Sequence, residues 1–356
     1  MSTQIEQSSS IRAAIAKVTS REDLNLVESE SVMKEIMSGV ATPGQIGALL
    51  TCLHLKGESM EEISAFANVM RKFATQIHPK VATPLLDTCG TGGDGFKTFN
   101  ISTLTALVAA AAGCAVAKHG NRAMSSHCGS ADLLESLGVK IDLDPANVEI
   151  CIEKVGIGFL FAPKFHPAMR FASPIRKEIG IPTVFNILGP LTNPANAPAQ
   201  ILGVKDIKLA KLMARVLQKL GIQRAYVVHG KPGIDELSIT GPSLAIKVTP
   251  EEIVEEKVTP EDFGMARAKI DDITCHSKDQ SVQIAMSVLR NQATQAQKDV
   301  VLLNSAFAIA AAKNITPQAG LKDAKQALEN LRAYQKLTEL ITQTGGKPRD
   351  ISPLQI

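Results

Sequence analysis

The stretch LLDTCGTGGDGFKTFNIST, residues 85–103, decides the fold, because a short apolar run leads into a glycine-rich turn and then into a helix start. Glycines after a strand let backbone N–H groups approach a phosphate closely. A purely structural turn would explain one or two glycines, but residues 90–95 contain four, with Asn100, Ser102 and Thr103 behind them. We therefore interpret the stretch as a strand, a phosphate-binding loop and a helix of an α/β domain.

Two better-known nucleotide-binding patterns fit this stretch less well, although its glycines satisfy the dinucleotide fingerprint G-x-G-x-x-G. The helix is expected to begin near Ser102 rather than at the last glycine, and Asp94 would repel a pyrophosphate unless a cation intervened. The next strand ends in Lys118, where a dinucleotide site would carry an acid. A P-loop would require a lysine where Phe96 stands.

The composition is that of a large globular protein, with 356 residues, 45% of them hydrophobic, and a net charge of +3. Two domains are the default for this length, and the mild charge gives no argument for a nucleic-acid partner. The six cysteines include no C-x-x-C pair, and this pattern argues against both a disulfide framework and a zinc site. We expect a cytoplasmic protein, because the longest apolar run, residues 107–117, is too short to span a bilayer.

The chain changes character near residue 82. Before it, the capping boxes that start at Thr42 and Ser59 predict helices and no strands. After it, strands and helices alternate, which predicts a mostly parallel sheet covered on both faces. The fold class is therefore α/β, with a small all-helical domain over residues 1–82 and a larger α/β domain over residues 83–356. Strands are expected at 85–87, 114–117, 157–161 and 225–229, and helices at 102–112, 131–137, 145–155, 206–220 and through the tail from about 280.

Two further loops follow predicted strands and should lie at the same edge of the sheet. Residues 118–130 carry two cations, an amide and three serines before a helix, which suits an anion. Residues 229–238 carry the adjacent acids Asp235 and Glu236, whose oxygens suit magnesium. A cation bridging these acids to a pyrophosphate would also explain Asp94.

A fourth stretch, residues 166–194, contains Arg176 directly after Pro174 and Ile175 on a predicted short helix. A guanidinium there could bind a carboxylate through two parallel hydrogen bonds. Taken alone, however, the run Arg-Lys-Glu is more typical of a solvated helix face.

Together these four stretches resemble the anthranilate phosphoribosyltransferase family over nearly the whole chain. The resemblance implies a nucleoside phosphorylase/phosphoribosyltransferase-like fold, in which residues of about 165–192 pack back on the small helical domain, and a homodimer. The motifs that carry it are, in order, residues 90–94 with 98–103, 118–122 with 125–126, 185–194, and 233–236.

The resemblance also implies the reaction. The phosphoribosyl group of 5-phosphoribosyl 1-pyrophosphate (PRPP) would move to the amino group of anthranilate in tryptophan biosynthesis, releasing pyrophosphate. Small molecules are thus the expected partners, with no nucleic acid and no membrane. The residues implied to hold PRPP are Gly90, Gly93, Asp94, Thr98, Asn100, Ile101, Ser102, Thr103, Lys118, His119, Gly120, Asn121, Arg122, Ala123, Met124, Ser125, Ser126 and Ser130.

Magnesium is the implied cofactor, with two ions per subunit held by Ser102, Asp235 and Glu236. An aromatic amine needs little activation to attack, so no general base is assigned. The residues implied to bind anthranilate are Gly90, Asn121 and Arg176, with Arg176 on its carboxylate and His119, Gly189 and Pro190 along its path.

The chain departs from the family pattern at two places. Ala123-Met124 stands where Ser-Val is commoner, and His127-Cys128 stands where Lys-Ser is commoner. A missing lysine in this loop is expected to weaken a phosphate contact without changing the family.

Two alternatives remain open at the level of the residues. A pyrimidine nucleoside phosphorylase has a similar architecture but would use free phosphate without magnesium, which the pair Asp235-Glu236 argues against. A non-catalytic relative that binds nucleic acid should carry a basic stripe and lack Asp94, Asp235, Glu236 and Arg176.

Overall fold

The fold is that of a computed structural model, which describes residues 10–123 and 127–351. Contacts divide the chain into two compact units. A helical unit contains the chain up to Thr75 together with His166–Thr192, and an α/β unit contains Gln76–Phe165 and the chain from Asn193 onward.

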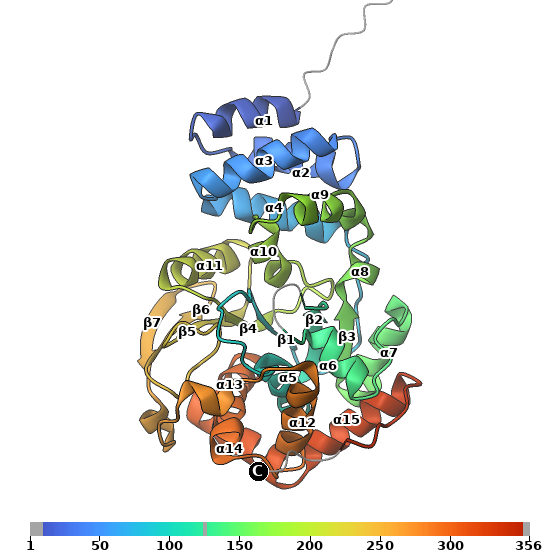
Figure 1. The fold of residues 1–356 in the computed structure, drawn as a ribbon, viewed down its shortest axis with the longest axis vertical. Coiled ribbons are helices and arrows are strands. Elements are labelled where there is room, and N and C mark those ends of the chain that lie inside the picture. The colour runs from blue at the N-terminus through green and yellow to red at the C-terminus, as the bar shows by residue number, and fades with distance from the viewer. Residues whose placement is uncertain (1–9, 124–126, 352–356) are drawn as a thin grey trace, which may run out of the picture. The chain divides into compact units, whose positions relative to one another are not determined.

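In the helical unit, four helices from the start of the chain are joined by short helices from residues 167–191 (Figure 1). Both predicted capping boxes are confirmed, because Thr42 exchanges hydrogen bonds with Gln45 and Ser59 does so with Glu62. The elements are α1 (Ser10–Thr19), α2 (Leu26–Met37), α3 (Pro43–Lys56), α4 (Met60–Phe73), η1 (Pro167–Phe171), α9 (Ser173–Ile179), α10 (Phe185–Leu188) and η2 (Gly189–Leu191).

The Glu62 carboxylate does more than cap α4. Its side chain is fully buried and accepts hydrogen bonds from the main-chain N–H of Leu24 at 2.9 Å and from Lys56 Nζ at 2.9 Å. A buried charge is tolerated when it is paired and hydrogen-bonded in this way. Glu62 therefore fixes the segment before α2 to the turn between α3 and α4.

The α/β unit is built on a seven-stranded sheet in the order β3-β2-β1-β4-β5-β6-β7. The first five strands in this order run parallel, and β6 pairs antiparallel with both β5 and β7, which confirms the predicted mostly parallel sheet. The strands are β1 (Leu85–Gly90), β2 (Ala115–Gly120), β3 (Ile157–Phe161), β4 (Ala199–Gly203), β5 (Arg224–Gly230), β6 (Ser243–Val248) and β7 (Ile253–Val258).

Three of these strands, β4, β6 and β7, were not predicted. All five residues of β4 are buried, so this central strand lacks the polar–apolar alternation that signals a strand. β6 and β7 form an antiparallel ribbon at the edge of the sheet, and Glu255, Glu256 and Lys257 of β7 are exposed. A strand that pairs on one side only and carries charges has a weak hydrophobic signal.

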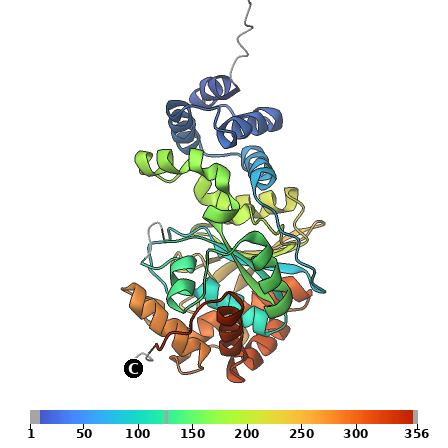
Figure 2. The same cartoon turned by 90° about the vertical axis from the view of Figure 1, so that its right-hand side faces the viewer.

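Helices cover both faces of the sheet (Figure 1). The helices α5 and α13 pack on one face, whereas α7 and α11 pack on the other. In Figure 2, the carboxyl-terminal helices, orange to red, lie along one side of the sheet. The elements are α5 (Ile101–Ala111), α6 (Ser130–Ser136), α7 (Pro145–Val155), α8 (Ala162–Phe165), α11 (Ile207–Lys219), η3 (Pro260–Phe263), η4 (Ile270–Ile273), α12 (Lys278–Leu289), α13 (Gln295–Lys313), α14 (Pro317–Glu329) and α15 (Arg332–Gln343).

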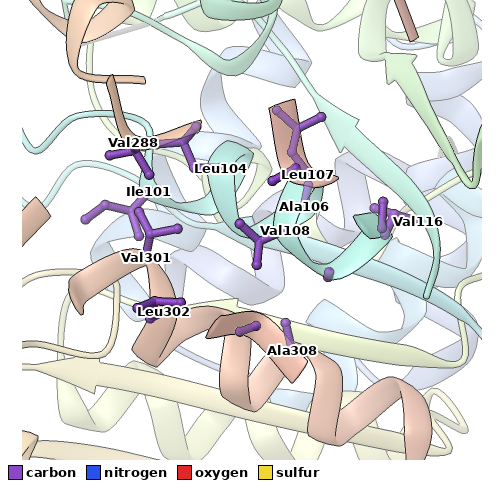
Figure 3. Packing of buried hydrophobic residues seen from close by; sticks show 14 of the residues in the cluster. Ile101, Leu104, Ala106, Leu107, Val108, Val116, Val288, Val301, Leu302 and Ala308 are labelled. Carbon is purple, nitrogen blue, oxygen red and sulfur yellow. The ribbon is translucent and has the colours of Figure 1, made fainter. Parts of the chain in front are cut away.

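The main core lies between the sheet, α5 and α13. Leu104 and Val108 of α5 and Val301 and Ala308 of α13 are all completely buried, and Figure 3 shows them in one cluster with Val116 of β2. A helix that is apolar around its whole circumference, as α5 is, must be buried on all sides. This core holds the amino-terminal end of α5 directly after the glycine-rich turn.

Among the described residues, no single helix is both long and apolar enough to cross a membrane. One pair, α13 with α14, reaches that composition jointly but is bent by 114°. All six cysteines are free thiols.

Stability of the helical unit should depend on pH through His166. Burial lowers the pKa of this imidazole to about 4, and a hydrogen bond to the main chain of Thr192 opposes the shift only in part. Between pH 4 and the ordinary value of about 6.5, the unfolded chain binds more protons, so stability is lost as pH falls through this window. At pH 5 the loss due to this one group should be about 2 kcal/mol.

Chemical denaturation of the wild type and His166→Gln at pH 7.5 and pH 5 would measure this loss. The wild type should lose about 2 kcal/mol more than the variant on acidification. An equal loss of stability in both proteins would mean that the pKa of His166 in the folded protein is close to its ordinary value.

Candidate active site

The strand order reverses between β1 and β4. The chain places β2 and β3 on one side of β1 and then crosses back to place β4 on the other side of β1. Ligands of open α/β sheets bind beyond the carboxyl ends of the strands at such a reversal. Here the two strands end in paired glycines, Gly90 and Gly203.

Both glycines are needed because the loop after β5 crosses them. A Cβ on Gly203 would overlap the carbonyl oxygen of Asp235, and a Cβ on Gly90 would overlap its carboxylate oxygen Oδ2. The same Oδ2 accepts a hydrogen bond from the N–H of Gly92 at 2.7 Å. The acidic loop is therefore fixed directly against the glycine-rich loop. The role of Gly203 could not be seen in the sequence, because its strand was not predicted.

Three carboxylates, Asp94, Asp235 and Glu236, gather at this point. Burial and the neighbouring carboxylate of Asp94 raise the pKa of Asp235 to about 6. Burial and the charge of Asp235 raise the pKa of Glu236 well above its ordinary value. Among the described residues, no donor reaches Oδ2 of Asp94. The carboxylates thus lack enough positive charge from the protein alone.

The charge of Lys118, which is 2% exposed, acts on Glu236. Its Nζ donates to the carbonyl oxygen of Thr88 at 2.6 Å and lies 3.5 Å from Oγ of Ser102. Burial lowers the pKa of Lys118, and the carboxylates of Asp87 and Glu236 counteract part of that shift. Lys118 therefore lies among groups that belong to β1, α5 and the acidic loop.

Ser102 connects the same three elements. Its main-chain N–H, in the first turn of α5, hydrogen-bonds the carboxylate of Glu236. Its carbonyl oxygen accepts a hydrogen bond from Thr88 Oγ1 at 2.9 Å. The structure consequently brings together Ser102, Lys118, Asp235 and Glu236, which the sequence places in three separate loops.

This donor set suits a hard divalent cation. Among the described residues, no group of three or more His, Cys, Asp or Glu side chains is arranged to hold a metal by itself. Magnesium usually takes only one or two carboxylates, and substrate phosphates and water complete its coordination. Such a cation would favour the charged carboxylates and so lower the raised pKa values of Asp235 and Glu236. It would also give the unpartnered oxygen of Asp94 a partner.

The remaining predicted residues of the glycine-rich stretch differ in accessibility. Thr98 forms a β-bridge with Thr274. Ile101 and Thr103 are each 1% exposed. Both side chains of the helix start are thus part of the core, and only Ser102 between them is partly accessible.

The amide side chain of Asn100 is already occupied by protein partners. Its Nδ2 donates to the carbonyl oxygen of Cys128 at 2.9 Å, and its Oδ1 accepts from Ser281 Oγ at 2.8 Å. In this structure Asn100 joins the start of α5 to the end of the loop after β2.

His119 lies near the carboxyl end of β2, and its main-chain N–H donates to Asp87 Oδ1 at 3.2 Å. Asn121 and Arg122 are exposed, whereas Gly120, Ala123 and Ser130 are half-buried. Arg122 forms ion pairs with Asp132 at 3.0 Å and Glu135 at 2.8 Å. The predicted residues Met124, Ser125 and Ser126 lie outside the described part of the chain.

Arg176 belongs to the helical unit, as do Gly189 and Pro190 of η2. Its guanidinium lies over the ring of Phe185 at 5.2 Å, and Nη2 lies 3.4 Å from Oδ1 of Asn186. Stacking on a ring restricts a long side chain and leaves the edge of the guanidinium for a planar anion.

Comparisons with known proteins agree with the fold class. The pattern described as "Glycosyl transferase family, a/b domain" matches residues 82–334, and "Glycosyl transferase family, helical bundle domain" matches residues 12–74. An anthranilate phosphoribosyltransferase of Chloroflexus aurantiacus is 51% identical over 340 residues, which cover 95% of this chain and 99% of the relative.

Two solved structures show the same fold. The anthranilate phosphoribosyltransferase of Thermus thermophilus matches with a TM-score of 0.88 at 41% identity, covering 93% of this chain and 99% of that one. The enzyme of Saccharomyces cerevisiae, in complex with PRPP and Mg, matches with a TM-score of 0.86 at 25% identity, covering 95% and 99%.

The contact between Gly203 and Asp235 yields a prediction. Gly203→Ala would push the main chain of Asp235 away from β4, so binding of magnesium pyrophosphate should weaken at least about tenfold. Gly44→Ala is the matched control, because a Cβ there has no atom within 4 Å. Isothermal titration calorimetry would measure both; equal affinities for the folded variants would contradict the role of this contact.

Proposed function

The chain belongs to the anthranilate phosphoribosyltransferase family, and on this premise we propose which of its residues carry out each part of the reaction. The enzyme transfers the phosphoribosyl group of PRPP to the amino group of anthranilate, a step of tryptophan biosynthesis, and gives N-(5'-phosphoribosyl)anthranilate and pyrophosphate. It is a magnesium-dependent pentosyltransferase acting on small molecules.

PRPP is held by the loops after β1 and β2 and by the start of α5. Three observations support this assignment: the glycine-rich loop lies at the sheet reversal, Lys118 is buried beside it, and α5 directs its amino-terminal end there. The proposed residues are Gly90, Gly93, Asp94, Thr98, Asn100, Ile101, Ser102, Thr103, Lys118, His119, Gly120, Asn121, Arg122, Ala123 and Ser130, with Met124, Ser125 and Ser126 outside the described part of the chain.

Two magnesium ions per subunit are proposed, held by Ser102, Asp235 and Glu236. Magnesium, when bound, stabilises the negative charge that develops on pyrophosphate as the bond to the ribose C1 breaks. The protein contributes fixed dipoles: the N–H of Gly92 already orients Asp235, and the N–H of Ser102 orients Glu236. Prealigned donors of this kind need no reorganisation during the reaction.

No general base is proposed. The lone pair of the anthranilate amine attacks C1, the bond from C1 to the pyrophosphate oxygen breaks, and the amine then loses a proton to water. Because the leaving group carries the difficult charge, catalysis rests on positioning and electrostatic stabilisation.

Anthranilate is proposed to bind to Gly90, Asn121 and Arg176, with His119, Gly189 and Pro190 along its path. The arginine suits the carboxylate, because a guanidinium can form two parallel hydrogen bonds with it. The stacking of Arg176 on Phe185 supports this role by limiting the orientations of the guanidinium.

A homodimer and a cytoplasmic location complete the proposal. The helical unit exposes large apolar side chains, with Val27 at 72%, Val40 at 69% and Leu55 at 71% exposure. A second copy of the chain that packs on the helical unit would cover such side chains.

One observation favours the transferase over a nucleoside phosphorylase. The pair Asp235-Glu236 lies against the glycine-rich loop at the point where the strand order reverses. A phosphorylase that handles free phosphate would gain nothing from two buried carboxylates at that position, because they would repel the phosphate. A pyrophosphate donor that binds with magnesium requires them.

Anthranilate fluorescence tests the function directly. With PRPP and magnesium, fluorescence should fall while pyrophosphate is released, and omission of magnesium should prevent both. Asp235→Asn combined with Glu236→Gln should lower kcat at least about a hundredfold and abolish the response to magnesium. Phosphorolysis of thymidine or uridine instead would establish the phosphorylase.

A matched control is available on the edge strand β7, where Glu255 and Glu256 are adjacent and exposed. Glu255→Gln with Glu256→Gln removes the same charge and should leave the magnesium titration as in the wild type. An unchanged titration in the Asp235/Glu236 variant would remove the metal role from those residues.

Arg176→Ala should raise the KM for anthranilate about tenfold to a hundredfold, with the KM for PRPP little changed, because a charge-assisted hydrogen bond contributes about 1.5–3 kcal/mol. Lys177→Ala, the exposed neighbouring cation, is the control. Steady-state kinetics would show the difference. If Arg176→Ala kept the wild-type KM, the carboxylate would bind elsewhere.

A further inference from the structure

The two ends of the loop after β2 are in direct contact at the base of the loop. A Cβ on Gly129 would overlap the main-chain nitrogen of Ala123 and crowd the carbonyl carbon of Arg122. The carbonyl oxygen of Asn121 accepts hydrogen bonds from the N–H of Ala131 at 3.2 Å and from Ser130 Oγ at 3.3 Å. The loop therefore closes on itself before α6 begins.

A single side chain, Asp132, holds both ends. Its Oδ2 accepts hydrogen bonds from the N–H of Ala123 at 2.9 Å and from the N–H of Gly129 at 3.0 Å. Its Oδ1 accepts from Nη1 of Arg122 at 3.0 Å. One carboxylate thus bonds to three residues of the loop.

The peptide unit that joins Cys128 to Gly129 is held from both sides. On one side Nδ2 of Asn100 donates to the carbonyl oxygen of Cys128, and on the other the N–H of Gly129 donates to Asp132. Asn100 is itself fixed by Ser281 of α12. The orientation of this peptide unit is therefore determined by α5, α6 and α12 together.

We infer that Asp132 is a positioning residue for PRPP binding: its carboxylate holds Arg122, Ala123 and Gly129 in the arrangement in which the loop receives the donor. The inference rests on the proposed function, which assigns Arg122 and Ala123 to the PRPP site. Asp132 acts through these residues and does not itself contact the donor. Holding these three residues in place during folding means that binding does not have to supply that free energy.

A purely structural role makes a different prediction. Asp132 is the third residue of α6, where a carboxylate commonly caps a helix. A cap alone would contribute to stability and would affect both substrates equally when removed. A positioning residue affects PRPP and leaves anthranilate unaffected, so the KM values of the two substrates separate the roles.

Asp132→Asn keeps the size of the side chain but loses its charge and one acceptor. Calorimetry should show that the Kd for PRPP with magnesium rises about tenfold, which is equal to about 1.4 kcal/mol. The KM for PRPP should rise by the same factor. The KM for anthranilate at saturating PRPP should stay within about twofold. Glu135→Gln is the control, because it removes the other ion pair of Arg122 and leaves the main-chain bonds intact. Its Kd for PRPP should stay within about twofold of the wild type.

A measurement on the unliganded wild type needs no variant. The N–H groups of Ala123 and Gly129 should exchange with deuterium at least about a hundredfold more slowly than in an unstructured peptide, because both donate to Asp132. Exchange at the unstructured rate would overturn the inference, even if Asp132→Asn failed to fold.

The remaining outcomes are distinct. If Asp132→Asn folds and binds PRPP like the wild type, or if both KM values rise equally, the inference is overturned and the proposed function stands. If Glu135→Gln weakens PRPP binding as much as Asp132→Asn, the effect comes from Arg122 alone, and the role of the main-chain bonds is overturned. A folded wild type that does not bind PRPP would overturn both the proposed function and the inference.

Discussion

The close passage of Asp235, with its main chain over Gly203 and its carboxylate over Gly90, is the contact on which the rest of the site depends. Two parallel strands end side by side in residues without a Cβ, and the loop from a third strand fills that space. The acidic pair can then reach the glycine-rich loop, and the first turn of α5 can reach Glu236. A larger residue at Gly203 would displace the loop, because close-packed interiors do not absorb an extra carbon at a backbone contact. A larger residue at Gly90 would displace the carboxylate of Asp235.

This geometry also explains the charge balance of the site. Asp94, Asp235 and Glu236 lie near one buried cation, Lys118, so the protein by itself leaves an excess of negative charge there. An anionic donor would be repelled by such a surface unless it arrives with a metal. In the proposed function, this arrangement therefore favours the magnesium complex of PRPP over the free anion.

Sequence patterns with a local physical cause could be predicted. The capping boxes at Thr42 and Ser59 involve residues three positions apart, and the α/β class follows from the alternation of apolar segments. The contacts that could not be predicted join distant parts of the chain. Gly203 meets Asp235 only because β4 lies beside β1, and β4 itself is too uniformly buried to show a strand pattern. The partners of Asn100, a carbonyl group of the next loop and a serine of α12, are likewise set by tertiary packing.

The edges of the sheet have a consequence for the behaviour of the protein at high concentration. The two edge strands are β3 and β7. The helices α7 and α8 pack against β3. An unpaired strand edge is a template for sheet extension between molecules, and natural proteins counter this with charged residues. Glu255, Glu256 and Lys257 supply such charges on β7. The same weak hydrophobic signal that hides β7 from pattern recognition thus protects the folded chain against edge-to-edge aggregation.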